Sequence, residues 1–280
     1  MNDLNLKNKV AVITGGAGLI CSAMAKTLAA QGVKTVIIDL DKEAAARVAD
    51  EIKKEFKTPS LGLAANVIDK ASLDASKKII NKNFGLIDIL VNGAGGNSPA
   101  ATTKVEKMEG SDTENPEDTF FGLQIEGFDQ VFDLNFKGTL LPSMVYPTDM
   151  IKQKSGVIVN ISSMNSYRPL TKIAAYSAAK AAVNNLTQWL AVHFSRTGIR
   201  VNAIAPGFLL TTQNRFLLVD EKSGEPTARA KKIINSTPME RFGTPDELTG
   251  TLLFLVSDLS KFVTGVVIPV DGGFSAYSGV

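Results

Sequence analysis

The stretch Val10-Ala-Val-Ile-Thr-Gly-Gly-Ala-Gly18, followed by Leu19-Ile-Cys21, decides the fold of this chain. Its apolar first half predicts a short buried strand, and residues 19–31 have the pattern of a helix. A glycine-rich turn between a strand and a helix lets the backbone approach a pyrophosphate at the helix N-terminus. Many loops are rich in glycine for conformational reasons alone, so the prediction depends on the residues that follow.

A second strand is predicted over residues 35–38, and it ends at Asp39. Dinucleotide-binding folds carry an acidic residue at about this distance from the glycine turn, where it accepts hydrogen bonds from the adenosine ribose. A carboxylate there also repels a 2′-phosphate, and Leu40 supplies no compensating cation, although Lys42 lies nearby. The pattern predicts NAD as the cofactor in preference to NADP.

Helices and strands alternate along the rest of the chain. The predicted helices cover residues 42–56, 71–83, 125–152, 172–196 and 244–257, and the predicted strands cover 61–65, 87–91, 156–162, 200–205 and 266–270. These strands are continuously apolar, which is typical of a parallel sheet covered on both faces. We therefore predict one α/β domain over residues 1–280, a Rossmann-type doubly wound fold with a mainly parallel sheet of about seven strands flanked by helices on both faces.

Two segments interrupt the alternation. Residues 96–124 form a polar, turn-rich insertion, which is either a surface excursion or a cover over the carboxyl ends of the strands. Residues 208–236 are irregular to helical, and we expect them to form a substrate loop. By contrast, Asp69, Lys70, Asp74, Lys77 and Lys78 indicate a solvated helix face.

The composition argues against several classes of protein. Lys and Arg number 30 against 28 Asp and Glu, without a basic stripe, so we expect no nucleic-acid partner. No apolar run approaches the ~20 residues of a membrane span, and residues 1–9 are too polar for a signal peptide. The single cysteine, Cys21, fits a reducing compartment, and one histidine without a ligand motif predicts no metal site. We expect a cytoplasmic protein.

The stretch Tyr176-Ser-Ala-Ala-Lys180 places a phenol and an ammonium four residues apart on a predicted helix. Positions i and i+4 share a helix face, so both groups can face one pocket. A nearby ammonium favours the phenolate, and moving the phenol pKa from ~10 toward 7 needs about 4 kcal/mol. Tyr176 could then exchange a proton with a carbonyl or alcohol oxygen. The same spacing also occurs as a solvated pair on surface helices.

With these elements in place, the chain resembles the short-chain dehydrogenase/reductase family over essentially its whole length. The matching residues are Thr14-Gly-Gly-Ala-Gly18, Asp39, Asn92-Gly-Ala-Gly95, Asn135, Ser163, Tyr176 with Lys180, and Pro206-Gly207 with Thr211. The step of thirteen residues from Ser163 to Tyr176 is the family's own, and it selects Ser163 over Ser162.

The resemblance implies a role for each matching residue. Tyr176 is expected to be the general acid and base, Ser163 to bind the substrate oxygen, and Asn135 to anchor a proton-relay water. Lys180 is expected to bind the nicotinamide ribose and to lower the Tyr176 pKa. The expected NAD-binding residues are Gly15, Gly16, Gly18, Leu19, Ile20, Asp39, Asn66, Val67, Asn92, Gly93, Ala94, Gly95, Tyr176, Lys180, Pro206, Gly207 and Thr211.

Three positions depart from the family pattern. Leu19 and Cys21 stand where the glycine motif normally has glycines, and Cys21 occupies a position of close helix–strand packing. Asn66 replaces an aspartate, so its hydrogen bond to the adenine lacks charge assistance. These departures leave open a dinucleotide-sensing protein without catalysis, but the presence of Ser163, Tyr176 and Lys180 argues against it.

Local similarity extends to one branch of the family, the short-chain-type D-mannonate oxidoreductases (fructuronate reductases). It is carried by residues 163–172, 211–216 and 95–99. The expected substrate-binding residues are Asn97, Asn165, Arg168, Gln213, Asn214 and Arg215, with Lys172 as a third cation. A planar guanidinium matches a carboxylate, so we expect a sugar acid. A 3-oxoacyl thioester or a neutral polyol or ketose is the alternative substrate.

The family resemblance also implies a homotetramer. The apolar helices at Asn135 and Trp189 are the expected subunit interfaces, and His193 is expected to serve packing or an interface rather than catalysis.

Overall fold

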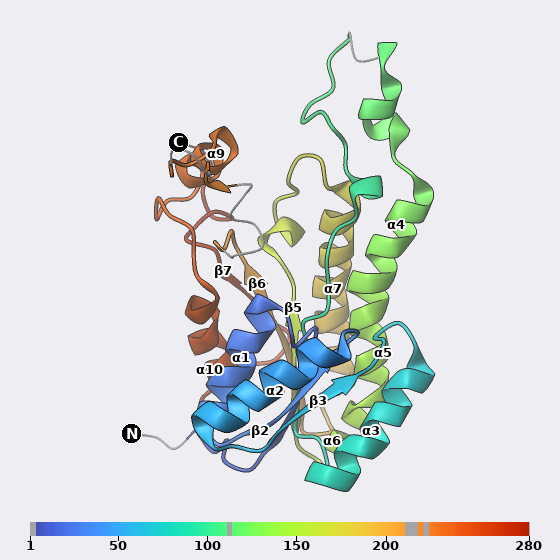
Figure 1. Ribbon diagram of the computed structural model, residues 1–280, viewed down its shortest axis with the longest axis vertical. Helices are drawn as coiled ribbons and strands as arrows, with labels where there is room; N and C mark the ends of the chain where they lie inside the picture. The colour runs from blue at the N-terminus through green and yellow to red at the C-terminus, as the bar shows by residue number, and fades with distance from the viewer. Residues whose placement is uncertain (1–3, 111–113, 211–217, 221–223, 280) are drawn as a thin grey trace.

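The computed structural model describes residues 4–110, 114–210, 218–220 and 224–279 (Figure 1). At its centre lies one seven-stranded sheet in the order β3-β2-β1-β4-β5-β6-β7, and every neighbouring pair is parallel. The strands are β1 (Val10–Thr14), β2 (Lys34–Asp39), β3 (Ser60–Ala64), β4 (Ile89–Asn92), β5 (Gly156–Ile161), β6 (Ile199–Pro206) and β7 (Val267–Val270). The predicted doubly wound α/β fold with a parallel sheet is confirmed.

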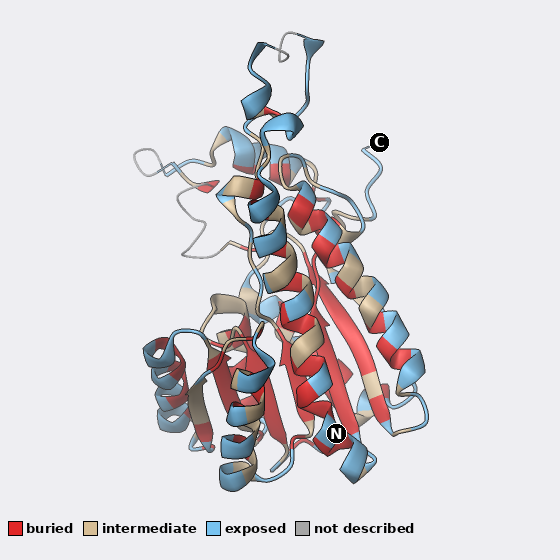
Figure 2. Cartoon of the chain, turned by 90° about the vertical axis from the view of Figure 1, so that its right-hand side faces the viewer, coloured by how far each residue is buried: buried red, intermediate tan, exposed pale blue. Residues whose placement is uncertain are grey.

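Helices cover both faces of the sheet. The helices in the described part of the chain are α1 (Leu19–Ala30), α2 (Lys42–Phe56), α3 (Lys70–Phe84), α4 (Ile125–Phe132), α5 (Gly138–Val145), α6 (Pro147–Gln153), α7 (Ala174–His193), α9 (Ala228–Asn235) and α10 (Thr249–Val256). One apolar core joins the sheet to α1, α2 and α10, and a second joins its other face to α3, α5, α6 and α7. Buried residues therefore concentrate along the strands and the inner faces of the helices (Figure 2).

The connections create a crevice at one edge of the sheet. The chain runs outward from β1 through β2 and β3, then returns to β4 on the opposite side of β1. In open α/β sheets, ligands bind outside the carboxyl ends of the strands where the strand order reverses in this way. The fully buried Thr14 joins the two sides, because its hydroxyl accepts hydrogen bonds from the amides of Gly93 (3.1 Å) and Ala94 (3.3 Å).

The stretch predicted as one helix over residues 125–152 is interrupted twice. A π-helical turn covers Asp133–Lys137 between α4 and α5, and it carries the fully buried Asn135. The helix is interrupted a second time where α6 begins at Pro147, because the proline nitrogen cannot donate a helical hydrogen bond. Single π turns inside helices are often found at functional sites.

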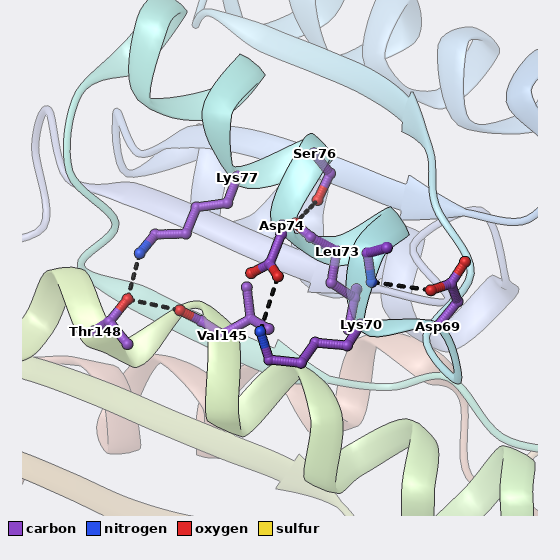
Figure 3. A network of polar contacts seen from close by, with 9 residues as sticks. Asp69, Lys70, Leu73, Asp74, Ser76, Lys77, Val145 and Thr148 are labelled. Carbon is purple, nitrogen blue, oxygen red and sulfur yellow. Dashed lines mark hydrogen bonds and ion pairs between the residues drawn. The ribbon is translucent and has the colours of Figure 1, made fainter.

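The predicted solvated face of α3 is only partly solvated. Lys70 and Asp74 form an exposed ion pair, and the Asp69 carboxylate caps the helix (Figure 3). Lys77 instead points toward α6, where it donates to the Thr148 hydroxyl and pairs with the fully buried Asp149 carboxylate at 2.9 Å. The prediction was wrong for Lys77, because its buried partner lies on an element distant in sequence.

The described part of the insertion, residues 96–110 and 114–124, contains short 3₁₀ turns at Pro99–Ala101, Pro116–Asp118 and Phe120–Gly122. Its first part contacts two other segments: the amide of Thr103 donates to the carbonyl of Lys172, and Glu106 pairs with Lys232 of α9. Its far end projects away from the sheet (Figure 1), with Phe121 70% exposed. The role of the segment as a cover over the carboxyl ends of the strands stays a prediction.

Among the described residues, no helix combines the length and the apolar character that crossing a membrane would require.

Candidate active site

A cleft of about 830 Å³ lies at the crevice formed by the reversal of strand order. Sixteen predicted site residues line it. They are Gly15, Gly18, Leu19, Ile20, Asp39, Asn66, Val67, Gly93, Ala94, Gly95, Asn97, Ser163, Tyr176, Lys180, Pro206 and Gly207. The fold thus gathers one cleft from segments that are more than 190 residues apart in the chain, since Gly15 and Gly207 both line it.

The glycine turn is shaped by a close approach between two loops. Gly15 has a φ of +61°, and a Cβ added there would lie 2.8 Å from the Cα of Ala94. A side chain at Gly15 would therefore be strained and would also push apart the turns after β1 and β4. The turn leads directly into α1, whose first amide groups have no partner within the helix.

Asp39 ends β2 beside this turn. Its Oδ2 accepts a hydrogen bond from the amide of Ala17 (3.1 Å), and its Oδ1 accepts from the amide of Asp41 (3.3 Å). The carboxylate thus braces the glycine turn while it lines the cleft. Leu40 next to it is 76% exposed and also lines the cleft, so an apolar side chain stands beside the acid.

Cys21 fits its unusual position because Gly93 has no side chain. A Cβ added at Gly93 would lie 2.1 Å from the Cys21 Sγ, well inside any real contact. The thiol is 3% exposed, and burial raises its pKa to about 12, so it is a neutral packing group at physiological pH. The departure at Cys21 is matched by the glycine opposite it.

Ser163, Tyr176 and Lys180 come from the end of β5 and the first turns of α7. Ser163 is 8% exposed, and its Oγ accepts a hydrogen bond from the amide of Asn165 (3.3 Å). The Nζ of Lys180 lies 5.6 Å from the centre of the Tyr176 ring and donates to the carbonyl of Ile161 (2.8 Å). Two hydroxyls and one ammonium therefore meet at one end of the cleft.

Burial governs the titration of this group. Burial raises the pKa of Tyr176, and the hydrogen bond to Ser163 lowers it by a smaller amount. The net direction is opposite to the predicted one, because the Lys180 ammonium lies over the ring and donates to Ile161 rather than to the hydroxyl. Burial also lowers the pKa of Lys180 to about 8. Both side chains are thereby shifted toward their neutral forms.

Asn135 hydrogen-bonds to the loop after β4 and is not among the residues that line the cleft. Its Nδ2 donates to the carbonyls of Gly96 (2.6 Å) and Val131 (2.8 Å), and its Oδ1 accepts from the amide of Gly96 (3.2 Å). A Cβ added at Gly95 would meet both the Asn135 Oδ1 and the Lys180 Nζ, so the amide lies close to the catalytic group. Its role as a water anchor stays a prediction.

Four other predicted residues that the structure describes lie away from the cleft lining. Asn92 is 1% exposed and donates to Ser143 (2.9 Å) and Asn160 (2.8 Å), which links β4 to its neighbours. Gly16 packs against Ile37. Arg168 is exposed, and its Nε donates to the carbonyl of Ser275 (3.4 Å).

The fourth of these residues, Asn165, is 5% exposed, and within the described residues its Oδ1 has no hydrogen-bond partner. Thr211, Gln213, Asn214 and Arg215 lie outside the described residues.

Several cleft residues were not named individually as site residues from the sequence. They are Leu40, Ala65, Gly96, Leu134, Ile161, Ser162, Ile173, Phe208 and Leu209. Most are apolar, and an apolar residue gives the same pattern whether it faces the core or a ligand. Proximity to a motif could have indicated Leu40, Gly96 and Ser162. Among the described residues, no cluster of His, Cys, Asp and Glu side chains could hold a metal ion.

Residues 16–275 match a family model described as enoyl-(acyl carrier protein) reductase. Two relatives, both oxidoreductases by name, are 50% and 51% identical to this protein over 99% of the chain. The family model and these relatives agree on the family to which the chain belongs. The chain belongs to the short-chain dehydrogenase/reductase family, a family of oxidoreductases, as its motifs predicted.

Three individual proteins are similar to this chain over almost its whole length. UxuB of Bacillus subtilis, an uncharacterized oxidoreductase, is 50% identical over 99% of this chain and 98% of its own length. A crystal structure with bound NAD exists for a Haemophilus influenzae protein that is proposed to be a D-mannonate oxidoreductase. Its sequence is 51% identical to this one, and the two structures superpose with a TM-score of 0.94 over 99% of this chain and 98% of that chain. A gluconate 5-dehydrogenase from Burkholderia cenocepacia, in complex with NADP and tartrate, is 30% identical with a TM-score of 0.82, covering 98% of each chain.

Proposed function

We propose that this protein is an NAD(H)-dependent oxidoreductase that interconverts a secondary alcohol and a ketone on a sugar acid, namely D-mannonate and D-fructuronate. The observation that carries the chemistry is that Ser163, Tyr176 and Lys180 line the same cleft as the glycine turn and Asp39. The substrate rests on the similarity to the Haemophilus influenzae protein.

The residues of the cleft fit a dinucleotide. Gly15 leaves a space at the turn that a Cβ would fill, and the first amides of α1 are available to a pyrophosphate. The Asp39 carboxylate is placed to accept from a ribose hydroxyl, and the neighbouring Leu40 offers no cation to a 2′-phosphate. Lys180 lies at the far end, near Tyr176. When bound, NAD(H) accepts or supplies the hydride.

The side chains of the cleft supply the proton. The raised pKa of Tyr176 keeps its phenol protonated at neutral pH, so it is ready to donate to a ketone oxygen during reduction. Ser163 donates to the same oxygen, since its hydroxyl already lies beside that of Tyr176. In oxidation the deprotonated form of Tyr176 takes the proton from the alcohol. The Lys180 ammonium, with its pKa near 8, stabilises negative charge that develops there.

Polar side chains near the serine suit a hydroxylated substrate. Asn97 lines the cleft, and the buried Oδ1 of Asn165 is an acceptor without a partner among the described residues. We keep Arg168 and Arg215 as candidates for the carboxylate, with Lys172 third.

The test compares substrates by NADH oxidation. We expect the parent enzyme to reduce D-fructuronate in preference to D-fructose, and to prefer NADH over NADPH by kcat/KM. Arg168→Ala or Arg215→Ala should raise KM for the acid more than for the neutral ketose, because only the acid loses an ion pair. Arg196→Ala is the matched control, since Arg196 is exposed just beyond α7. Equal effects on both substrates would exclude these arginines from acid binding.

A 3-oxoacyl thioester is the second candidate substrate, favoured by the description of the family model. The same assay separates the two, because the proton chemistry at Ser163 and Tyr176 is common to both. Turnover of a 3-oxoacyl thioester with D-fructuronate inert would remove the sugar-acid proposal and keep the oxidoreductase.

A further inference from the structure

The side chains of Ser162, Asn184 and Ser166, together with the backbone between residues 162 and 163, form a hydrogen-bonded ring beside Ser163. The hydroxyl of Ser162 donates to the Oδ1 of Asn184 (2.5 Å), and the Nδ2 of Asn184 donates to the hydroxyl of Ser166 (2.7 Å). Ser166 in turn donates to the carbonyl oxygen of Ser163 (2.6 Å). The ring therefore ties α7 to the residues on both sides of Ser163.

Asn184 stands on the helix face that carries the catalytic group. Tyr176, Lys180 and Asn184 are spaced at i, i+4 and i+8 on α7, so their side chains leave the helix in similar directions. Lys180 donates to the carbonyl of Ile161, immediately before Ser162, and Asn184 reaches Ser162 and Ser166. Helix α7 is thus hydrogen-bonded both to the end of β5 and to the turn that follows it.

We propose that Asn184 is a positioning residue for this reaction: it holds the Ser163 segment against α7 so that the Ser163 hydroxyl stays beside that of Tyr176. This proposal rests on the proposed function, because it assigns Ser163 the binding of the reacting oxygen. It also assigns a role to Ser162, which belongs to the ring and not to the proton chemistry.

The chemistry of the ring calls for an amide at position 184. An asparagine side chain accepts at one atom and donates at another, so it satisfies Ser162 and Ser166 together. Because it donates to Ser166, the single proton of the Ser166 hydroxyl is free to bind the Ser163 carbonyl. Without Asn184, two partly or fully buried hydroxyls lose a partner, and the Ser163 carbonyl loses its fixed donor. A misplacement of about 1 Å at a reacting group can cost ~10²-fold in rate.

Amide hydrogen exchange tests the positioning without any substrate. The amides of residues 165–168 bond to Ser163 or Met164, so they report whether this turn is held. In Asn184→Ala and in Ser166→Ala they should exchange at least about tenfold faster than in the parent. Asn185→Ala is the matched control, because Asn185 is the same residue type, next along α7 and exposed. Parent-like exchange in both ring variants would overturn the proposal.

Kinetics with NADH and D-fructuronate then tests the consequence. Both ring variants should lower kcat by about 10–100-fold, while the Kd for NADH and the Tm stay within the range of the Asn185→Ala control. The double variant Asn184→Ala/Ser166→Ala should fall no further than the worse single variant, because both act on one unit. Parent-like kcat, or additive losses with a lowered Tm, would overturn the proposal. If the parent does not reduce D-fructuronate, the proposed function fails, and the exchange experiment still decides the role of Asn184.

Discussion

Burial acts in the same sense on Tyr176 and Lys180, since it disfavours the charged form of each. For Tyr176 this suits the proposed reaction, because a protonated phenol is the form that donates to a ketone. For Lys180 it is a cost to the fold, because an ammonium that is 4% exposed has lost most of its water. Lys180 is therefore required by the proposed chemistry but lowers the stability of the free protein.

Lys180→Met should raise the free energy of unfolding at pH 7. The pKa of Lys180 falls from 10.5 to about 8 on folding, so between these values the unfolded state binds more protons and the stability of the parent rises with pH. Below pH 8 the full cost remains, about 3 kcal/mol, from which ~1 kcal/mol is subtracted for the lost bond to Ile161. Urea titrations at pH 7 and pH 9.5 should show a variant about 2 kcal/mol more stable at pH 7, with a smaller gain at pH 9.5. A gain that grows with pH would contradict this account.

Gly93→Ala should be costly, and most of the cost should depend on Cys21. The added Cβ would lie 2.1 Å from the Cys21 Sγ and 2.9 Å from the Thr14 carbonyl oxygen. In a Cys21→Ala background only the second, milder contact remains. A double-mutant cycle on unfolding free energy should give a coupling of at least about 1 kcal/mol, favouring the double variant.

Gly96→Ala is the control for Gly93→Ala, because it lies in the same loop and its added Cβ would meet only a Leu134 side-chain atom at 3.5 Å. It should change stability by less than about 1 kcal/mol. Independent effects of Gly93→Ala and Cys21→Ala would show that the thiol is not the obstacle.

Among the elements, α3 is fixed to α5 and α6 by buried polar contacts. Ser76 hydrogen-bonds to the hydroxyl of the fully buried Tyr146 (2.7 Å), and Lys77 pairs with Asp149. Burial raises the pKa of Tyr146 to about 12, so its phenol stays protonated in this contact. Directional polar contacts of this kind fix the position of α3 relative to α5 and α6, whereas apolar contacts alone would permit small shifts.

Asp149→Ala should destabilise the protein by about 3 kcal/mol, because it leaves the amide of Ile87 and the mostly buried Lys77 ammonium without their acceptor. Lys152→Ala is the control: this side chain is 66% exposed and 3.8 Å from the same carboxylate, so its loss should be near neutral. Thermal unfolding of the two variants measures the difference. A loss of similar size in both would mean that Lys77 contributes little.

The predictability of the elements depended on whether their signal is local. Continuous apolar runs and helical periodicity are local signals, so the strands and helices such as 42–56 are found where they were expected. Pro147 was a visible sign that the helix over residues 125–152 breaks, whereas nothing in the local sequence indicates the π turn at Asn135. The pairing of Lys77 with Asp149 spans 72 residues, and charge patterns within one helix cannot reveal it.

At the scale of the whole molecule, the parallel topology brings the ends of β1, β2, β4, β5 and β6 to one edge. Motif spacing could place Tyr176, Ser163 and Lys180 in one cleft because the order of such a sheet is constrained. It could not give the ring around Ser163 or the direction of the Tyr176 pKa, since both depend on side-chain packing.

We also propose that residues 1–280 form one domain and that the protein is a homotetramer. The exposed side chains of Trp189 (57%) and Val192 (76%) on α7 are candidates for an interface. Trp189 stacks on His193 with ring centres 4.6 Å apart, which suits the expected packing or interface role of the histidine.

The most direct test of the central claim is the initial rate of NADH oxidation by the parent and by Tyr176→Phe. The reaction uses D-fructuronate, and NADH affinity is measured in parallel by fluorescence. Tyr176→Phe keeps the ring in the cleft and removes only the hydroxyl that donates the proton. We expect kcat to fall by ~10²–10⁴-fold while the Kd for NADH stays unchanged. Turnover within tenfold of the parent, with NADH binding intact, would contradict the assignment of Tyr176 as the proton donor.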